Sequence, residues 1–256
     1  MIHPTAVIHP KAELDLSVEV GPCAVIGEHV TIGRNTTVGT HSVIEGWTRI
    51  GEDNQIFPLA SVGGVPQDLK YKGEKTWLII GDRNIIREFA TIQPGTVTGI
   101  GETVIGNDNL FMAYCHVAHD CLIGNRVIMA NGATLAGHVL VEDFAILGGL
   151  SAIHQYVRIG ESAMLSGGAM VGQDVAPYTI AAGDRARMRG LNIVGLRRRG
   201  IPSEIISILK RAYRILVLSK LRVSDALARI RAELPVCPEV NHFVDFIEKS
   251  ERGICR

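Results

Sequence analysis

Aliphatic residues return at every sixth position along much of the chain. Ten positions keep this register from Ile8 to Val62, and after breaks around 68–74 and 93–104 it holds from Ile105 to Val171. An amphipathic helix repeats near 3.6 residues and a half-buried strand near 2, so neither explains a strict period of six. A fixed short period indicates a solenoid, in which each repeat buries its apolar side chain against its neighbours.

A mostly small residue lies two positions before many of these aliphatic residues. These small residues are Ala24, Ser42, Ala60, Cys115, Cys121, Ala133, Ala145, Ser151 and Ala163. Alternating large and small inward positions fit a narrow prism with a solid core. The pattern resembles the hexapeptide-repeat acyltransferases, which implies a left-handed parallel β-helix with three hexads, or about 18 residues, in each triangular coil.

The repeat predicts a mainly β domain over residues 1–190, followed by a small α-helical domain over 191–256. Two inserted loops are expected, a polar one near 64–78 and a glycine-rich one near 93–104. Long excursions from a regular scaffold usually serve a site, because loops can approach ligands that flat sheet faces cannot.

The hexads end after Val171, and we expect a linker from there to about Gly200. Apolar residues at helical spacing then predict three helices, the first of them capped by a serine. The expected first residues of these helices are Ser203, Ser224 and Pro238.

Composition narrows the class of protein further. Basic and acidic residues both number 26, so overall charge indicates neither a nucleic-acid partner nor a membrane surface. The five cysteines form no CxxC pair, which favours buried thiols in a reducing compartment. No apolar stretch is long enough to span a bilayer, and the repeat begins at Ile2 in place of a signal peptide. We expect a cytoplasmic protein without stable membrane insertion.

Four of the nine histidines fall between positions 116 and 154, and coil arithmetic brings them together. Subtracting about 18 residues for each coil projects them onto positions 116, 118, 119 and 120. They are His116, His119, His138 and His154. We therefore expect them on one edge over three successive coils, where strands are spaced by about 4.8 Å. A neutral imidazole at such a site can take a proton from a hydroxyl at physiological pH.

Two residues next to His119 suit acyl transfer. Asp120 follows it directly and could orient the ring, although only a corner turn would let neighbouring side chains pair. Gly137 lies one coil above, where its lack of a side chain lets a substrate approach a backbone N–H that can bind a developing oxyanion.

Five motifs in chain order make the resemblance specific. They are PQDLKY (66–71), HVAHDCLIGN (116–125), LAGHV (135–139), IHQY (153–156) and GLNIVGLRRRG (190–200). Together they are similar to the UDP-N-acetylglucosamine O-acyltransferases that begin lipid A biosynthesis, a part of lipopolysaccharide synthesis. The resemblance spans essentially the whole chain, including its helical end.

The resemblance implies the reaction and its residues. A 3-hydroxyacyl group would pass from acyl carrier protein to the sugar 3-hydroxyl, without cofactor or metal, in a homotrimer with sites between subunits. His119 would be the general base, Asp120 its partner and Gly137 the oxyanion donor. The implied substrate-binding residues are Gln67, Asp68, Lys70, His116, His138, His154, Gln155, Asn192, Arg198 and Arg199.

The resemblance also implies that Gly167 sets acyl-chain length, because the residue there blocks the far end of the acyl groove in the family. This sequence departs from the family pattern at two positions. Val194 replaces a frequent glutamate near the nucleotide, and Arg185 replaces a frequent histidine near the chain's end. Gly167 predicts a long groove, whereas the long side chain of Arg185 would shorten it.

Three alternative functions remain at this point. A zinc hydratase similar to the gamma-type carbonic anhydrases would use His116, His119 and His138 as metal ligands. The related glucosamine N-acyltransferases share the repeat but carry an extra N-terminal uridine-binding domain, whereas the repeats here begin at residue 2. A solenoid that only binds a partner is the third alternative.

Overall fold

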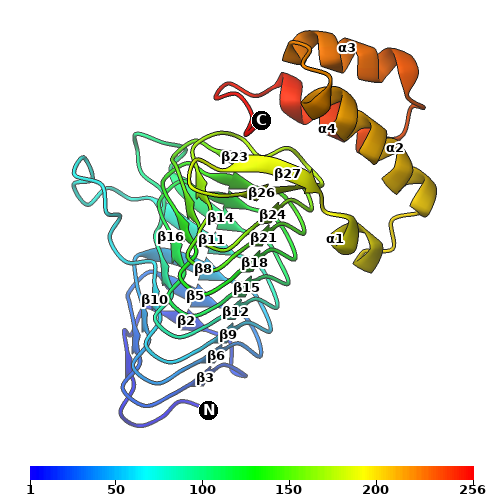
Figure 1. Cartoon of the computed structure of the whole chain (residues 1–256). Helices are drawn as coiled ribbons and strands as arrows, with labels where there is room; N and C mark the ends of the chain where they lie inside the picture. The colour runs from blue at the N-terminus through cyan, green and yellow to red at the C-terminus, as the bar shows by residue number, and fades with distance from the viewer.

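The computed structural model describes all of residues 1–256, which form three parallel sheets wound into a prism with helices at one end (Figure 1). Sheet I contains β1 (Val7–Ile8), β4 (Val25–Ile26), β7 (Val43–Ile44), β10 (Ser61–Val62), β13 (Thr91–Ile92), β16 (His116–Val117), β19 (Thr134–Leu135), β22 (Ala152–Ile153) and β25 (Met170–Val171). Sheet II contains β2 (Glu13–Leu14), β5 (Val30–Ile32), β8 (Trp47–Ile50), β11 (Trp77–Ile80), β14 (Glu102–Ile105), β17 (Leu122–Ile123), β20 (Leu140–Val141) and β23 (Arg158–Ile159). Sheet III contains β3 (Glu19–Val20), β6 (Thr37–Val38), β9 (Gln55–Ile56), β12 (Ile85–Ile86), β15 (Leu110–Phe111), β18 (Ile128–Met129), β21 (Ile146–Leu147), β24 (Met164–Leu165), β26 (Thr179–Ala182) and β27 (Arg187–Leu191).

The hexad residues fill the interior of the prism, as the period predicts. Ile44 and Leu135 are fully buried, and the small residues Ala24 and Ala133 are buried beside the larger ones. The predicted parallel β-helix followed by a helical region is confirmed.

The two insertions lengthen two coils without breaking the strand register. His116 pairs with Thr134 in an uninterrupted coil, 18 positions on. Val62 pairs with Ile92 around the first loop, which occupies 63–76 between β10 and β11. The second loop occupies 93–101 between β13 and β14. The last residues of both predicted loop ranges therefore belong to strands.

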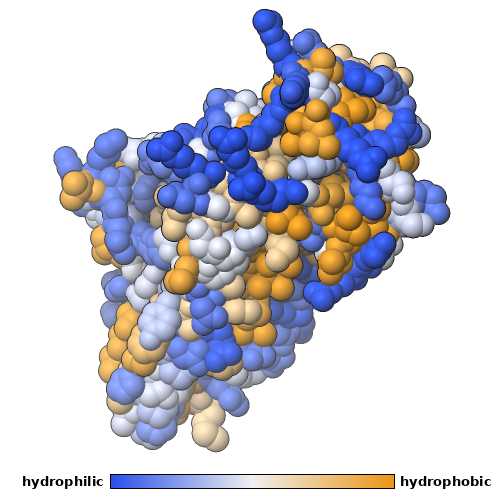
Figure 2. All heavy atoms as spheres, in the orientation of Figure 1, coloured by the Kyte–Doolittle hydropathy of each residue, from blue (hydrophilic) through white to orange (hydrophobic).

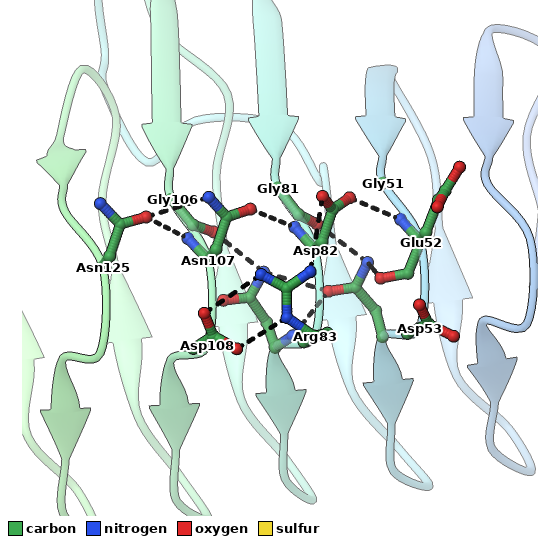
Figure 3. A network of polar contacts seen from close by, with 12 residues as sticks. Gly51, Glu52, Asp53, Gly81, Asp82, Arg83, Gly106, Asn107, Asp108 and Asn125 are labelled. Carbon is green, nitrogen blue, oxygen red and sulfur yellow. Dashed lines mark hydrogen bonds and ion pairs between the residues drawn. The ribbon is translucent and has the colours of Figure 1, made fainter.

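One corner of the prism carries a ladder of amide and carboxylate side chains (Figure 3). The buried Asn54 accepts hydrogen bonds from the backbone and side-chain nitrogens of Asn84, which in turn accepts the same pair from Asn109. In an outer row the direction is reversed, and the backbone N–H of Glu52 donates to the Asp82 carboxylate on the next coil. Each coil thus satisfies the polar groups of the next, and we call this corner the asparagine corner.

The segment expected to be a linker is ordered differently. The strands β26 and β27 form an antiparallel hairpin on sheet III, and α1 (Ile193–Arg198) follows. The prediction of a linker was wrong because β26 and β27 pair with each other in antiparallel fashion, and such pairing does not require the six-residue period of the coils.

The helical region contains α2 (Ser203–Tyr213), a π-helical turn at Arg214–Leu218, α3 (Val223–Glu233) and α4 (Pro238–Glu248). The helix expected at Pro238 starts there, whereas α3 begins at Val223, one residue earlier than expected. Ser203 does not cap α2, because Pro202 holds the N-cap position and the serine hydroxyl donates to Glu204 instead. No helix combines the length and apolar character that crossing a bilayer requires.

Candidate active site

His119 and Asp120 lie in the turn that follows β16. Asp120 adopts a left-handed backbone conformation with φ of 59°, and this turn brings its side chain back against the preceding residue. His119 Nδ1 and Asp120 Oδ2 are 2.8 Å apart. A carboxylate on Nδ1 favours the tautomer that carries its proton there, which leaves Nε2 as the basic nitrogen.

The glycine-rich second loop covers the Asp120 carboxylate. Thr96 donates to it from both its backbone N–H and its hydroxyl, and Ile100 and Gly101 donate from their backbone N–H groups. The Asp120 side chain has no solvent exposure, and 15% of the His119 side chain is exposed. The buried carboxylate is thus hydrogen-bonded on both oxygens.

Burial acts to raise the pKa of Asp120, but donors around it prevail. The Thr96 hydroxyl, His119 and nearby His138 favour the ionised form, so the pKa lies below its ordinary value. The pair at this corner therefore consists of a carboxylate that stays charged and an imidazole that can accept a proton.

Gly137 lies directly over the His119 ring. A Cβ atom on this glycine would stand 2.6 Å from His119 Cε1 and 2.8 Å from Nε2, closer than side chains tolerate. The Gly137 N–H makes no hydrogen bond within the chain, so it is a free donor one coil above the base. A base with a free donor beside it is what acyl transfer requires.

His138 and Tyr156 continue this corner upward, and we call it the histidine corner. The rings of His119 and His138 have centroids 5.0 Å apart, and Tyr156 stacks on His138 at 4.4 Å. Burial lowers the pKa of His138, and the charges of Asp120 and Asp68 only partly offset this. A cavity of about 650 Å³ opens beside Asp120, His138 and Tyr156.

His116 and His154 belong to the same edge but have other partners. His116 projects from β16, where its Nδ1 lies 2.7 Å from the Thr91 hydroxyl. His154 is exposed, and its Nδ1 lies 3.1 Å from the Gln155 carbonyl and 3.3 Å from an Arg252 nitrogen.

The first loop carries candidate substrate-binding residues close to His138. Asp68 is close enough for its charge to act on His138, and it accepts the backbone N–H of Lys70. Gln67 is exposed and anchored through its backbone N–H to Gln93. This loop therefore lies by the histidine corner within one chain.

The other implied binding residues lie on a different corner. Asn192 is buried, caps α1 through Gly195 and donates to the Ser162 carbonyl. Arg199 pairs with Glu161 at 2.6 Å and lies over the Phe144 ring.

Arg198 is exposed beside this group, and Val194, on the same helix, is exposed as well. The strand β20 separates the turn at His138 from the turn at Phe144. Within one chain, the fold therefore does not bring the arginines to the histidines.

One group of side chains could hold a metal ion, namely His119, Asp120 and His138, whose ligand atoms lie within 4.8 Å of one another. His116 has no ligand atom in this cluster, and its Nδ1 lies 2.7 Å from the Thr91 hydroxyl, so the three-histidine zinc set does not assemble. The Asp120 oxygens already accept bonds from the second loop and His119, which leaves them little capacity to ligate an ion.

Sequence reasoning missed Thr91, Thr96 and Tyr156. Coil arithmetic could have found Tyr156, which lies 18 positions after His138. Thr96 lies within the second insertion, which has no register with the coils. Thr91 pairs with His116 in the register of β13 and β16, but the insertion between them lengthens the coil, so a step of 18 residues does not connect the two.

The prism and this corner define a hexapeptide-repeat acyltransferase. A model of bacterial transferase hexapeptide repeats matches residues 102–137, and a model of domain 2 of UDP-N-acetylglucosamine O-acyltransferase matches 174–255. The acyl-[acyl-carrier-protein]–UDP-N-acetylglucosamine O-acyltransferase of Thermodesulfovibrio yellowstonii is 56% identical over 216 residues, 84% of each chain. That of Burkholderia orbicola is 52% identical over 211 residues, 81% of this chain and 80% of the relative.

Solved structures give the same result. A UDP-N-acetylglucosamine acyltransferase from Bacteroides fragilis is 44% identical, superposes with a TM-score of 0.97 and covers all of both chains. One from Campylobacter jejuni is 40% identical with a TM-score of 0.95, covering all of this chain and 99% of the other. The chain belongs to the family of acyl-[acyl-carrier-protein]–UDP-N-acetylglucosamine O-acyltransferases, and the predicted resemblance is confirmed.

Proposed function

We propose that this chain transfers a 3-hydroxyacyl group from acyl carrier protein to the 3-hydroxyl of UDP-N-acetylglucosamine, the first step of lipid A biosynthesis. Its relatives are named acyl-[acyl-carrier-protein]–UDP-N-acetylglucosamine O-acyltransferases. The observation that carries the proposal is the His119–Asp120 pair with Gly137 directly over the imidazole and the Gly137 N–H unbonded within the chain.

The reaction follows from the chemistry of this group. His119 Nε2 takes the proton of the sugar 3-hydroxyl, and the oxygen attacks the thioester carbonyl carbon. The Gly137 N–H stabilises the oxyanion that forms. When the carbon–sulfur bond breaks, the imidazolium returns its proton to the departing thiolate. Asp120 stays ionised and holds the ring in the productive tautomer, so no cofactor or metal is required.

The sugar lies against the histidine corner in this proposal. Asp68, Lys70 and Gln67 approach from the first loop, which lies near His138 in the same chain. His116, His138, His154 and Gln155 line the edge where the sugar binds.

The nucleotide contacts come from a second subunit. Asn192, Arg198 and Arg199 lie on another corner, and a planar guanidinium suits phosphate oxygens. A threefold homotrimer would bring this corner of one subunit to the histidine corner of the next.

The outer face of sheet III supports such packing. Its outward side chains form a partly exposed apolar column: Ile85, Leu110, Ile128, Ile146 and Met164. Apolar residues gather on the upper coils below the helices in Figure 2. An exposed apolar face of this kind marks an interface.

Mixed assemblies test the shared site. Subunits carrying His119→Ala and subunits carrying Arg198→Ala are each expected to be weakly active alone. Mixed trimers should regain activity, because some sites then combine an intact histidine with an intact arginine. A stable, fully active monomer in a solution mass measurement would contradict the assembly.

The acyl chain in this proposal runs towards Gly167. This glycine is exposed, and a Cβ atom there would meet only the Gly149 carbonyl oxygen, at 3.4 Å. Arg185 is exposed in the turn of the terminal hairpin and lines a cavity of about 630 Å³ together with His154. Gly167 therefore leaves room for a long chain.

Free-thiol release tests the activity. The purified protein is incubated with 3-hydroxyacyl carrier protein, and thiol is measured with and without UDP-N-acetylglucosamine. We expect release only with the sugar nucleotide, and a chelator should not change its rate. Thiol release that does not depend on the sugar would contradict the proposed function.

A further inference from the structure

The second loop concentrates its hydrogen-bond donors on one carboxylate. Between β13 and β14 the chain leaves the coil, and three of its backbone N–H groups and one hydroxyl reach Asp120. The loop residues themselves carry no titratable side chain between 93 and 101. The structure therefore gives this insertion a target inside the chain, the Asp120 carboxylate.

The Thr96 hydroxyl is placed to fix the orientation of that carboxylate. It lies 2.7 Å from Asp120 Oδ2, the same oxygen that lies 2.8 Å from His119 Nδ1. Thr96 is buried, so no water competes for this contact. Two donors on one oxygen from different directions restrict rotation of the carboxylate and hence of the imidazole bonded to it.

The close approach of the loop depends on a glycine. A Cβ atom on Gly99 would overlap the carboxyl group of Asp120, so a side chain there would force the loop away. Sequence and geometry thus agree that this segment is shaped around Asp120.

We propose that Thr96 is a positioning residue for acyl transfer, acting on His119 through the Asp120 carboxylate. This inference rests on the proposed function. Thr96 touches no reacting atom; it holds the pair in the orientation from which the imidazole removes the proton. The second insertion is then a support for the base, whereas the first approaches the substrate.

Thr96→Val tests the proposal, because valine keeps the shape and the backbone N–H but removes the hydroxyl donor. We expect kcat to fall by about 10-fold to 100-fold with KM unchanged, since small misplacement of a catalytic group costs this much. Thr96→Ser, which keeps the donor, should restore most of the turnover. Thr96→Ala offers a second variant without the donor should valine impair folding.

The matched control is Thr103→Val on β14. Thr103 is also fully buried, but its hydroxyl has no hydrogen-bond partner. The same substitution there should leave kcat at the wild-type value.

A double-mutant cycle separates positioning from general structural damage. In an Asp120→Asn background, Thr96→Val should have little further effect on kcat, because the carboxylate through which it acts is gone. Equal losses in both backgrounds, or a Thr96→Val enzyme within twofold of wild type, would overturn the proposal. A wild-type protein that makes no sugar ester would instead overturn the proposed function.

Discussion

The asparagine corner and the histidine corner are built on the same kind of turn, but one stabilises the prism and the other forms the candidate active site. At both, a residue with positive φ turns the chain between two sheets, as at Asp108 and at Asp120. At the asparagine corner, side chains such as Asn84 form hydrogen bonds with the neighbouring coils. At the histidine corner, the Gly137 N–H makes no bond within the chain, and an inserted loop supplies the bonds that hold Asp120.

The two corners show how a repetitive scaffold acquires a site. A repeat satisfies its own polar groups by stacking, which yields stability and no reactivity. The candidate active site lies where an insertion interrupts the regular coils. The loop between β13 and β14 bonds to the Asp120 carboxylate, which in turn contacts the His119 imidazole. Substitutions at the two corners should therefore separate turnover from stability.

The largest expected effect is that of His119→Ala on turnover. A positioned general base contributes about 10² to 10⁴ in rate, so kcat should fall by that factor. Folding and thermal stability should change little, because the buried Asp120 carboxylate keeps the hydrogen bonds from Thr96, Ile100 and Gly101 when the imidazole is removed. Steady-state kinetics and thermal melting check this, and turnover within a few-fold of wild type would reject His119 as the base.

Asn84→Ala should lower the stability of the protein and leave its turnover unchanged, the reverse of His119→Ala. It leaves the Asn109 side-chain and backbone donors and the Gly106 carbonyl without partners. Each unsatisfied buried group costs about 1 to 3 kcal/mol, so we expect a loss of about 3 kcal/mol or more. The melting temperature should fall by roughly 6 to 12 °C, while kcat of the folded fraction stays unchanged.

Asn35→Gly is the control for the ladder, because glycine tolerates the φ of 56° at this position without strain. Asn35 donates its side-chain N–H to Asp53 on the surface, where a lost bond should cost about 0.5 kcal/mol or less. If both asparagine variants melt alike, the ladder does not stabilise the prism as described.

Gly167→Met extends the tests to the third corner of the prism, the turn between β24 of sheet III and β25 of sheet I. The methionine would occupy the space that a long acyl chain needs, and each excluded methylene costs about 0.8 kcal/mol. Preference should move towards shorter donors, at least tenfold for a chain two or more carbons too long. Competition between carrier-bound donors of different lengths measures this, and an unchanged preference would mean that Gly167 does not set the length.

The smallest expected effect concerns the upper end of the asparagine corner, where charges replace amides. His242 on α4 lies 2.7 Å from Glu142. This hydrogen bond raises the pKa of His242 against the effect of burial, with Glu161 and Asp245 adding to the rise. Stability from the pair is therefore complete below pH 6.5 and is lost as pH rises through the higher pKa of the folded protein.

We expect the melting temperature to fall by about 2 to 4 °C across this range, because a partly exposed pair contributes about 1 kcal/mol or less. His242→Gln should abolish that part of the pH dependence. If the melting temperatures of wild type and His242→Gln change equally with pH, the His242–Glu142 pair does not contribute to stability as described.

Periodicity predicted the parts of the fold that repeat. The buried positions, the parallel sheets and the alignment of His119 beneath Gly137 all follow from a period of six and a coil of three hexads. Thr96 could not be placed, because the insertion that contains it has no register with the coils. The terminal hairpin escaped prediction for a similar reason, since antiparallel pairing does not continue the hexads.

Parts of the candidate site came only from the resemblance. No pattern in the sequence connects Asn192 or Arg199 to the histidines, and within one chain they lie on another corner. Stacking arithmetic works inside a chain and carries no information about which corner of a neighbour faces it.

The most direct test of the account is the product that the wild-type protein makes. Purified protein is incubated with 3-hydroxyacyl carrier protein and UDP-N-acetylglucosamine, and the sugar nucleotide is examined by mass spectrometry and NMR. We expect one acyl group in ester linkage at the 3-oxygen, one free thiol for each ester, and about 100-fold less ester or lower with His119→Ala in the same time. Thioester hydrolysis without an acylated sugar, or an ester made equally well by His119→Ala, would contradict the account.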